Sequence, residues 1–271
     1  MIVTQDYGWS QIARQRKIGW PEGTEWAMRQ AFKAGLDGWE PFHATTQDAN
    51  RVIALAKECG LKMPSFFVAG TLHAEPEAEA EIARMTEIAA IAASSGATMA
   101  AVYPVSLGQV DKSDAQLAVQ FTSLHNLALR FRELGVKLLY HPEEPEMRQS
   151  ACEFHHMLAQ SDPDLIRFCL DPDTIWRGAG RSNLAILDTI ALYGHRIDAI
   201  HLRQSVGGVW DETVGPGDLD YPAVASALRA MGQEPLLVIE SACEDNAIAI
   251  LDPVVAQKQS LAYVKATFGR T

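Results

Sequence analysis

The sequence predicts an α/β fold, a single (β/α)8 barrel over residues 1–271, and three observations lead to this prediction. Eight short apolar segments recur along the chain, with starts 27 to 39 residues apart. A segment with helical periodicity follows each of them. This spacing holds one strand, one helix and two loops, which together make a βα unit. The chain has 271 residues, close to the roughly 250 residues of one such barrel.

The eight predicted strands are nearly continuous apolar runs, the pattern of parallel strands that are buried on both faces. They begin at Ile2 (IVTQ), Leu36 (LDGWEPF), Met63 (MPSFFVAG), Thr98 (TMAAVYPV), Val136 (VKLLYHP), Ile166 (IRFCLDP), Ile197 (IDAIHLR) and Leu236 (LLVIES). Their number favours a closed barrel over an open doubly wound sheet. An open nucleotide-binding sheet would carry G-x-G-x-x-G after its first strand, and the segment DYGW that starts at Asp6 does not match this motif.

Start and stop signals delimit the helices between these strands. Pro21 is expected in the first turn of the first helix, with Gly35 just after its end. Ser113 and Gly135 delimit the fourth helix in the same way. We therefore expect helices at 21–34, 45–59, 75–93, 113–134, 147–160, 184–193, 221–231 and 253–268.

Composition limits the partners of the protein. Hydrophobic residues make up 48% of the chain, so a substantial core can form, and the net charge is −11. Nucleic acids and anionic membranes attract basic faces, so neither is an expected partner. The N-terminus has no secretory leader and no apolar run reaches the length of a membrane span, which predicts a cytoplasmic protein. The four scattered cysteines are expected to be small buried thiols, and the formation of a homo-oligomer stays open.

Polar side chains follow several of the predicted strands at the point where each strand ends. In a (β/α)8 barrel the functional residues lie at these C-terminal ends. The candidates are Glu40 and His43 after the second strand, His141 and Glu143 after the fifth, Asp171 after the sixth, His201 after the seventh and Glu240 after the eighth.

The candidates on the last four strands indicate a metal site. Adjacent strands lie about 4.8 Å apart, so side chains from four neighbouring strands can converge on one ion. A mixed imidazole and carboxylate set suits one divalent ion among Mn, Mg, Co, Fe and Zn. At the fifth strand, alternation places His141 and Glu143 on the same face, so either can be the ligand.

Other residues are candidates for substrate contact. Arg203 shares a face with the histidine two residues before it and is placed to orient a substrate, unless it forms a surface ion pair. Glu40 and His43 are expected on the opposite wall, and Trp176 as an apolar wall. Glu212 lies in the glycine-rich loop 205–219, which is either a mobile lid over the site or a simple connector.

These motifs resemble the xylose isomerase-like sugar phosphate isomerase/epimerase superfamily of TIM barrels. The segments that carry the resemblance are AGLDGWEPF, LLYHPE, CLDPDTIWRGAG, IDAIHLRQS, GPGDLDY and VIES, in that order over nearly the whole chain. The resemblance implies one divalent ion held by Asp171, His201, Glu240 and a fifth-strand residue. The Glu-Pro pair typical of the fifth strand is His-Pro here, so either His141 replaces the glutamate or Glu143 reaches the ion. Retention of an acid favours Glu143.

The resemblance also implies a reaction. An isomerase or epimerase of a small sugar, keto-sugar or sugar acid would use the metal ion to stabilise an enediolate. Glu143 would take the α-proton, and Glu240 would return it. No phosphate-cradling loop of the GxGxxG or GxxxxGK type is present, which favours an unphosphorylated substrate.

Two other functions fit the same residues. A metal-dependent dehydratase or lyase that acts on an inosose- or shikimate-like substrate needs the same enolate chemistry and the loss of a β-hydroxyl. A sugar-binding barrel without catalysis is the second alternative. A nuclease of the same fold would need three metal ions, more ligands and a basic face for DNA, and the acidic charge argues against it.

Overall fold

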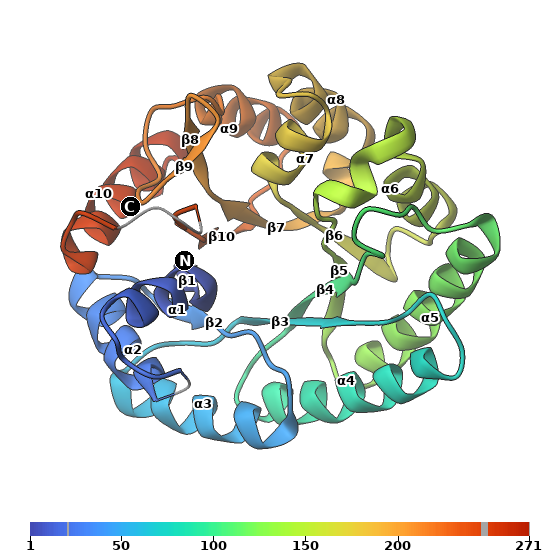
Figure 1. The fold of residues 1–271 in the computed structure, drawn as a ribbon, viewed down its shortest axis with the longest axis horizontal. Coiled ribbons are helices and arrows are strands. Elements are labelled where there is room, and N and C mark those ends of the chain that lie inside the picture. Colours follow the sequence, from blue (N-terminus) through green and yellow to red (C-terminus); the bar gives the residue numbers. More distant parts are fainter. Residues whose placement is uncertain (21, 245–248, 271) are drawn as a thin grey trace.

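In the computed structural model, which describes residues 1–20, 22–244 and 249–270, eight parallel strands form a ring inside a layer of helices (Figure 1). The order around the sheet is β2-β1-β10-β7-β6-β5-β4-β3. This arrangement confirms the predicted barrel. The strands are β1 Ile2–Gln5, β2 Gly38–Glu40, β3 Ser65–Gly70, β4 Met99–Pro104, β5 Lys137–Tyr140, β6 Ile166–Leu170, β7 Ile197–Leu202 and β10 Leu236–Ile239.

Isolated bridges close the barrel between β2 and β3. The other neighbouring strands pair through continuous ladders. Gly38 pairs with Lys62, and Phe42 pairs with Phe67. The amide of Trp39 donates to the Lys62 carbonyl at 2.8 Å. A Cβ atom on Gly38 would lie 2.3 Å from that carbonyl oxygen, so the close approach of the two strands requires glycine at this position.

Helices cover the outside of the barrel at the positions that the start and stop signals predict. Thr45 and Ser113 accept hydrogen bonds from backbone amides in the first turns of α3 and α5, and Gly35 and Gly60 end α2 and α3 in the left-handed conformation. The predicted role of Pro21 lies outside the described residues. The helices are α1 Asp6–Gln15, α2 Gly23–Ala34, α3 Thr46–Cys59, α4 Glu77–Ser94, α5 Asp114–Glu133, α6 Arg148–Gln160, α7 Pro172–Gly178, α8 Asn183–Tyr193, α9 Tyr221–Ala230 and α10 Pro253–Phe268, with short 3-10 turns η1 Glu144–Met147 and η2 Gly194–Arg196.

The sequence did not predict two of the helices and one hairpin. Helix α1 follows β1 directly, and α7 starts at Pro172, where the carboxylate of Asp171 accepts hydrogen bonds from the first-turn amides. The loop after β7 contains a hairpin, formed by β8 Gln204–Val206 and β9 Val209–Asp211. Its two turn residues, Gly207 and Gly208, both have positive φ, which matches the twist of a two-residue hairpin turn. The glycines that suggested a loose loop therefore form a structured turn.

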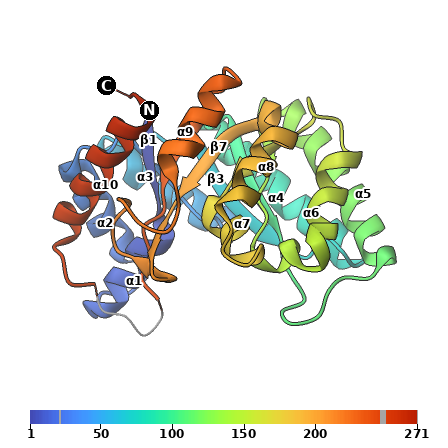
Figure 2. The same ribbon diagram turned by 90° about the horizontal axis from the view of Figure 1, so that it is seen from above.

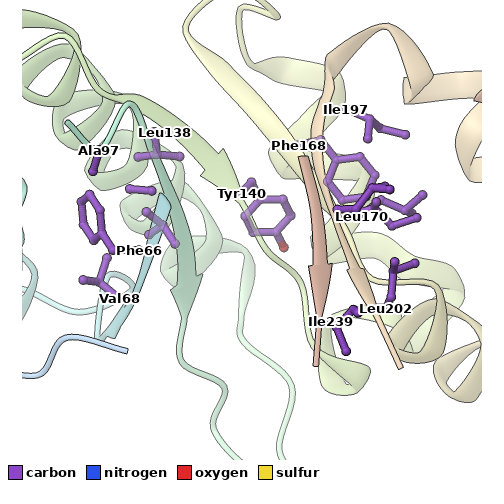
Figure 3. Packing of buried hydrophobic residues seen from close by; sticks show 14 of the residues in the cluster. Phe66, Val68, Ala97, Leu138, Tyr140, Phe168, Leu170, Ile197, Leu202 and Ile239 are labelled. Atoms are coloured by element: carbon purple, nitrogen blue, oxygen red, sulfur yellow. The ribbon is translucent and has the colours of Figure 1, made fainter. Parts of the chain in front are cut away.

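Alternating side chains along the strands divide the core into two parts. One set faces the helices, and Figure 3 shows part of it: Phe66, Val68, Ala97, Leu138, Tyr140, Phe168, Leu170, Ile197, Leu202 and Ile239. The other set fills the barrel interior, and we call it the inner layer: Val3, Phe67, Ala101, Leu139, Cys169, Ala199, Leu236 and Val238. The two sets alternate in sequence because successive strand residues point to opposite faces.

The side view places α1 at one end of the strands and the N-terminus at the other (Figure 2). Within the described ranges, no helix has the length and apolar character that a membrane crossing requires. Cys59, Cys169 and Cys243 are buried free thiols, as predicted. The prediction was wrong for Cys152, which is exposed because it lies on the solvent side of α6.

We predict that Phe154→Ala will lower the free energy of unfolding by about 3–5 kcal/mol. Phe154 is fully buried and contacts the rings of Tyr140, Phe168 and Tyr193, so its loss leaves a cavity between strands and helices. Urea denaturation measures the change. The matched control is Phe32→Ala, because Phe32 is 56% exposed. Equal effects of the two substitutions would contradict the assigned core.

Candidate active site

Four polar side chains form a layer directly above the inner layer, at the C-terminal ends of four neighbouring strands. Each lies two residues beyond an inner-layer residue, so it points into the barrel as that residue does. The four are His141, Asp171, His201 and Glu240, and we call them the floor cluster. All are buried, and one potential ligand atom from each lies within 4.8 Å of the others. The structure therefore brings together residues that the sequence proposed from strands five to eight.

Several polar atoms of the floor cluster have no partner. Among the described residues, neither ring nitrogen of His141 has a hydrogen-bond partner, and neither has Oδ2 of Asp171. The other oxygen of Asp171 accepts the amides of Asp173 and Thr174 at 2.9 and 3.2 Å. Buried polar atoms without partners are costly, and a divalent cation is the ligand that imidazole and carboxylate groups at this spacing fit.

The fifth strand contributes two candidate groups, and they occupy different places. The ring of His141 belongs to the floor cluster. Glu143, the fifth-strand ligand favoured from the sequence, lies beside the cluster, with its Oε1 3.7 Å from Nδ1 of His141 and about one-third of its side chain exposed. Its amide donates to Glu146 at 2.8 Å. The geometry therefore gives the imidazole the inner position and the carboxylate a position in the cleft above.

A buried arginine determines the charge of the floor cluster. Arg203 donates to Glu240 at 2.5 Å, and its Nη2 lies 3.8 Å from Oδ2 of Asp171. Burial favours the neutral form of Glu240, but Arg203 and the hydrogen bond from His201 outweigh it and lower the pKa of Glu240 to about 2. Burial and the nearby charge of His201 hold the pKa of His141 well below its usual value. This keeps His141 in the neutral form that can ligate metal.

Opposing influences also act on the two remaining carboxyl groups near the cluster. Burial raises the pKa of Asp171 to about 6, against the lowering effect of Arg203. Burial raises the pKa of Glu143 to about 8, and the charges of Asp171 and Glu240 add to this increase. Carboxyl groups with unequal proton affinities therefore stand side by side in the site, which is an arrangement that acid–base chemistry uses.

The two second-strand candidates lie beneath the site and not on a cleft wall. Oε1 of Glu40 is 2.8 Å from Nε2 of His201, although the two atoms are not aligned for a hydrogen bond, and the other oxygen of Glu40 accepts from Ser65. Nδ1 of His201 lies 2.8 Å from Glu240. His43 is buried, with its ring near Phe66. Glu40 is thus placed to hold the ring of His201 and not to contact a substrate.

A cleft of about 470 Å³ opens above the floor cluster. Glu143, Arg203 and Glu240 reach it from below, and aromatic rings form much of its wall. The lining residues are Gln5, Asp6, Tyr7, Ser10, Arg14, Trp20, Phe42, Phe67, Ala69, Tyr103, Glu143, Arg203, Trp210 and Glu240. This volume lies within the range of small-molecule sites, about 300–1,000 Å³.

Sequence reasoning missed several of these lining residues, although one signal was present. Asp6 and Tyr7 follow the first strand, and Tyr103 is the second-last residue of the fourth, so the strand-end rule applies to them as well. Asp6 accepts the amide of Phe42 at 3.1 Å, and burial raises the pKa of Asp6 to about 8. A carboxyl group that keeps its proton near neutral pH therefore faces the cleft beside β10, the strand that precedes Glu240.

The β8–β9 hairpin places Trp210 over the cleft. Its indole N–H donates to Asp173 at 2.7 Å, and its amide donates to Glu244 at 3.2 Å. The guanidinium of Arg203 lies 4.5 Å from the Trp210 ring centre, and that of Arg177 lies 4.8 Å from it. These contacts hold the indole of the hairpin against the C-terminal end of β6.

The other two loop candidates lie away from the cleft. Trp176 is buried, with Arg181 over its ring at 5.6 Å, and is not among the lining residues. Glu212 accepts the amides of Ile250 and Leu251 at 3.0 to 3.2 Å, so it holds the segment that leads into α10. Neither position was evident from the sequence, because the path of a loop is not a local property.

Comparison with known proteins agrees with this geometry. The family model described as xylose isomerase-like TIM barrel matches residues 28–267. The chain therefore belongs to the xylose isomerase-like TIM barrel family. A search of curated proteins finds no significant match.

Several solved structures share the fold at low sequence identity. A sugar phosphate isomerase/epimerase from Parabacteroides distasonis is 15% identical, with a TM-score of 0.74 over 98% of this chain and 93% of that one. An L-ribulose 3-epimerase is 18% identical, with a TM-score of 0.75 over 99% and 94%. A 3-keto-D-glucoside 4-epimerase from E. coli is 18% identical, with a TM-score of 0.71 over 98% of both chains. At these identities the likeness establishes the fold.

We predict that Asp173→Asn will loosen the β8–β9 hairpin. The substitution removes the negative charge that holds Trp210 and Arg177, and loss of a charged hydrogen bond corresponds to a roughly tenfold larger open population. The rate of thermolysin cleavage near the exposed Val206 and Val209 measures the open population of the hairpin. Asp188→Asn, at an exposed position of α8, is the control. Equal cleavage rates in the two variants would show that Asp173 does not hold the hairpin.

Proposed function

We propose that the protein is a divalent-metal-dependent isomerase or epimerase of a small sugar, keto-sugar or sugar acid. The observation that carries the proposal is the floor cluster: four buried ligand side chains, with unpartnered atoms, beneath a cleft of about 470 Å³. Membership in the xylose isomerase-like family supports it, as do structural neighbours described as sugar epimerases.

The floor cluster would hold the ion through His141, Asp171, His201 and Glu240, with His141 in place of the Glu143 favoured from the sequence. When bound, a divalent cation supplies Lewis-acid stabilisation of an enediolate. Mn, Mg, Co, Fe and Zn all remain candidates for this position. Glu40 would keep the ring of His201 in place, because an outer carboxylate beside a ligating imidazole fixes its orientation.

Two carboxylates would move the proton. Glu143 faces the cleft, and in its ionised form it takes the α-proton of the substrate on a carboxylate oxygen. Burial raises the pKa of Glu143 to about 8, so this form becomes dominant only above that pH. Glu240 then delivers a proton that it takes up from solvent to the neighbouring carbon in an isomerisation, or to the opposite face in an epimerisation, and the proton on Glu143 leaves to solvent. Arg203 contacts Glu240 and lines the cleft, so it orients both that carboxylate and a substrate hydroxyl or carboxylate.

The cleft walls would exclude water and position the sugar. Trp210, Tyr7 and Phe67 present apolar faces to the cleft, and such faces pack against the C–H side of a sugar ring. The hairpin contact of Trp210 with Asp173 connects this wall to the strand end that carries Asp171. A shift of the Trp210 wall would therefore also move the strand end that carries Asp171.

A metal-dependent dehydratase acting on an inosose- or shikimate-like substrate is the second candidate, and Asp6 favours it. Loss of a β-hydroxyl needs a general acid, and Asp6 is a cleft carboxyl whose pKa is raised to about 8 by burial. A protonated carboxyl can donate to the departing hydroxyl. Product analysis separates the two reactions, because a dehydratase yields a product that has lost water.

We predict that Mn²⁺ will stabilise chelator-treated protein, and that Asp171→Asn will abolish the effect. A ligand at 100 times its Kd adds about 2.7 kcal/mol to the free energy of unfolding. Denaturation with and without the ion measures it. Asp188→Asn, on the exposed side of α8, should keep the full stabilisation. Protein that gains nothing from any of the five candidate ions would refute the metal site.

We predict that Glu240→Gln will lower turnover by at least about 100-fold, because it removes an acid–base group and a ligand charge. A panel of ketoses and keto-acids, incubated with metal-loaded protein in D2O, reports α-proton exchange and product identity. Glu58→Gln, at an exposed position of α3, should behave as wild type. Unchanged exchange in Glu240→Gln would remove Glu240 from the reaction, and no exchange with any substrate would favour a binding protein.

A further inference from the structure

A thiol lies directly below the floor cluster and has no part in the proposed reaction. Cys169 is on β6, two residues before Asp171, and it is fully buried in the inner layer. Ligand atoms of Cys169, His141 and His201 lie within 4.8 Å of one another. Two imidazoles of the floor cluster therefore also face a sulfur atom on their inner side.

A second observation supports a ligand at this place. His141 is 1% exposed, and neither of its ring nitrogens has a hydrogen-bond partner in the part of the chain that the structure describes. Its ring centre lies 4.7 Å from that of His201. A buried imidazole with both nitrogens unpartnered is unfavourable, and an ion on either side of it satisfies one nitrogen.

The orientation of His201 makes its two nitrogens face different acids. Nδ1 lies 2.8 Å from Glu240 in the floor cluster, and Nε2 lies 2.8 Å from Glu40. Glu40 is fully buried and lies outside the cleft wall. The ring of His201 thus stands between an upper carboxylate and a lower one, and it can serve a ligand on either side.

We propose that Cys169, His141 and His201 form a second cation position, which takes a thiophilic divalent ion such as Zn²⁺ or Cd²⁺ in place of the ion of the floor cluster. Thiolate and imidazole ligands select such ions, whereas carboxylates suit harder ones. As the metal–sulfur and metal–nitrogen bonds form, the S–H bond of Cys169 and one N–H bond of the protonated His201 break, and both protons leave to solvent. The two positions exclude each other because they share both imidazoles.

The geometry needs only a small contraction. In a tetrahedral zinc site with bonds of about 2.0–2.3 Å, the ligand atoms are about 3.5 Å apart. The three atoms here lie within 4.8 Å of one another, so the ligand atoms need to approach one another by no more than about 1.3 Å. A carboxylate oxygen of Glu40, beside His201, is available for the fourth position. A thiophilic ion in the lower position would draw both imidazoles away from the cleft and so inhibit the enzyme.

The experiment is a titration of chelator-treated protein with Cd²⁺, followed by calorimetry and by the ultraviolet charge-transfer band of a cadmium thiolate. Wild type is expected to bind one ion with this band. Cys169→Ser should lose the band and bind Cd²⁺ at least tenfold more weakly. Cys59→Ser is the matched control, since Cys59 is also a buried free thiol, and it should behave as wild type. Cys169→Ala repeats the test with an apolar side chain in case the serine variant does not fold.

Three results would overturn the proposal: no thiolate band in wild type, a band that persists in both Cys169 variants, or simultaneous binding of Cd²⁺ and Mn²⁺. The second cation position does not depend on the proposed function, and the Asp171→Asn variant tests the two separately. That variant should lose Mn²⁺ binding and keep the cadmium thiolate band. A wild type with the band but no sugar chemistry would leave the lower position established and refute only the proposed reaction.

Discussion

Burial of charge at the floor of the cleft is the constraint on which the rest of the structure depends. Glu240 sits at the end of an apolar strand, and an isolated carboxylate there would be very unfavourable. Arg203 and His201 both contact it, and Glu40 contacts the other side of His201. The charges form a connected network across the barrel, so no member can be changed without an effect on the others.

The barrel supplies the rigidity that this network needs. Apolar side chains of the inner layer fill the space below it, and the helix-facing side chains of the same strands pack against the surrounding helices. The network stays incomplete on one side, because atoms of His141 and Asp171 have no hydrogen-bond partner among the described residues. A closely packed scaffold can hold such atoms in place where a looser one would rearrange to satisfy them. Glu240 is the member of the floor cluster that also lines the cleft, so it connects the incomplete side of the network to the cleft.

The hairpin after β7 connects the scaffold to the cleft wall. Asp173, two residues beyond Asp171, accepts from Trp210 and pairs with Arg177. The end of β6 therefore presents one side chain, Asp171, to the floor cluster and a second side chain, Asp173, to the hairpin. The same short segment therefore connects the floor cluster to the cleft wall, in keeping with barrels whose strand ends and loops together form the functional face.

Much of the fold could be predicted from local patterns, because strand and helix periodicity are local properties. Glycine and Ser113 signals located helix ends to within a few residues. The errors occurred where local rules compete. Gly207 and Gly208 were taken for a loose loop, although two consecutive residues of positive φ also make a tight hairpin turn. Helix α1 was missed because DYGW, after β1, was considered only as a nucleotide-binding motif.

By itself, the sequence determined the alternation of strands and helices and the polar residues that end strands five to eight, since both follow from short-range periodicity. Only the tertiary structure decided that His141 enters the floor cluster while Glu143 faces the cleft, that Glu40 lies beneath His201, and that Trp210 and not Trp176 forms the wall. These outcomes depend on barrel closure and on loop paths. Contacts between residues far apart in the chain set both, and no local pattern encodes them.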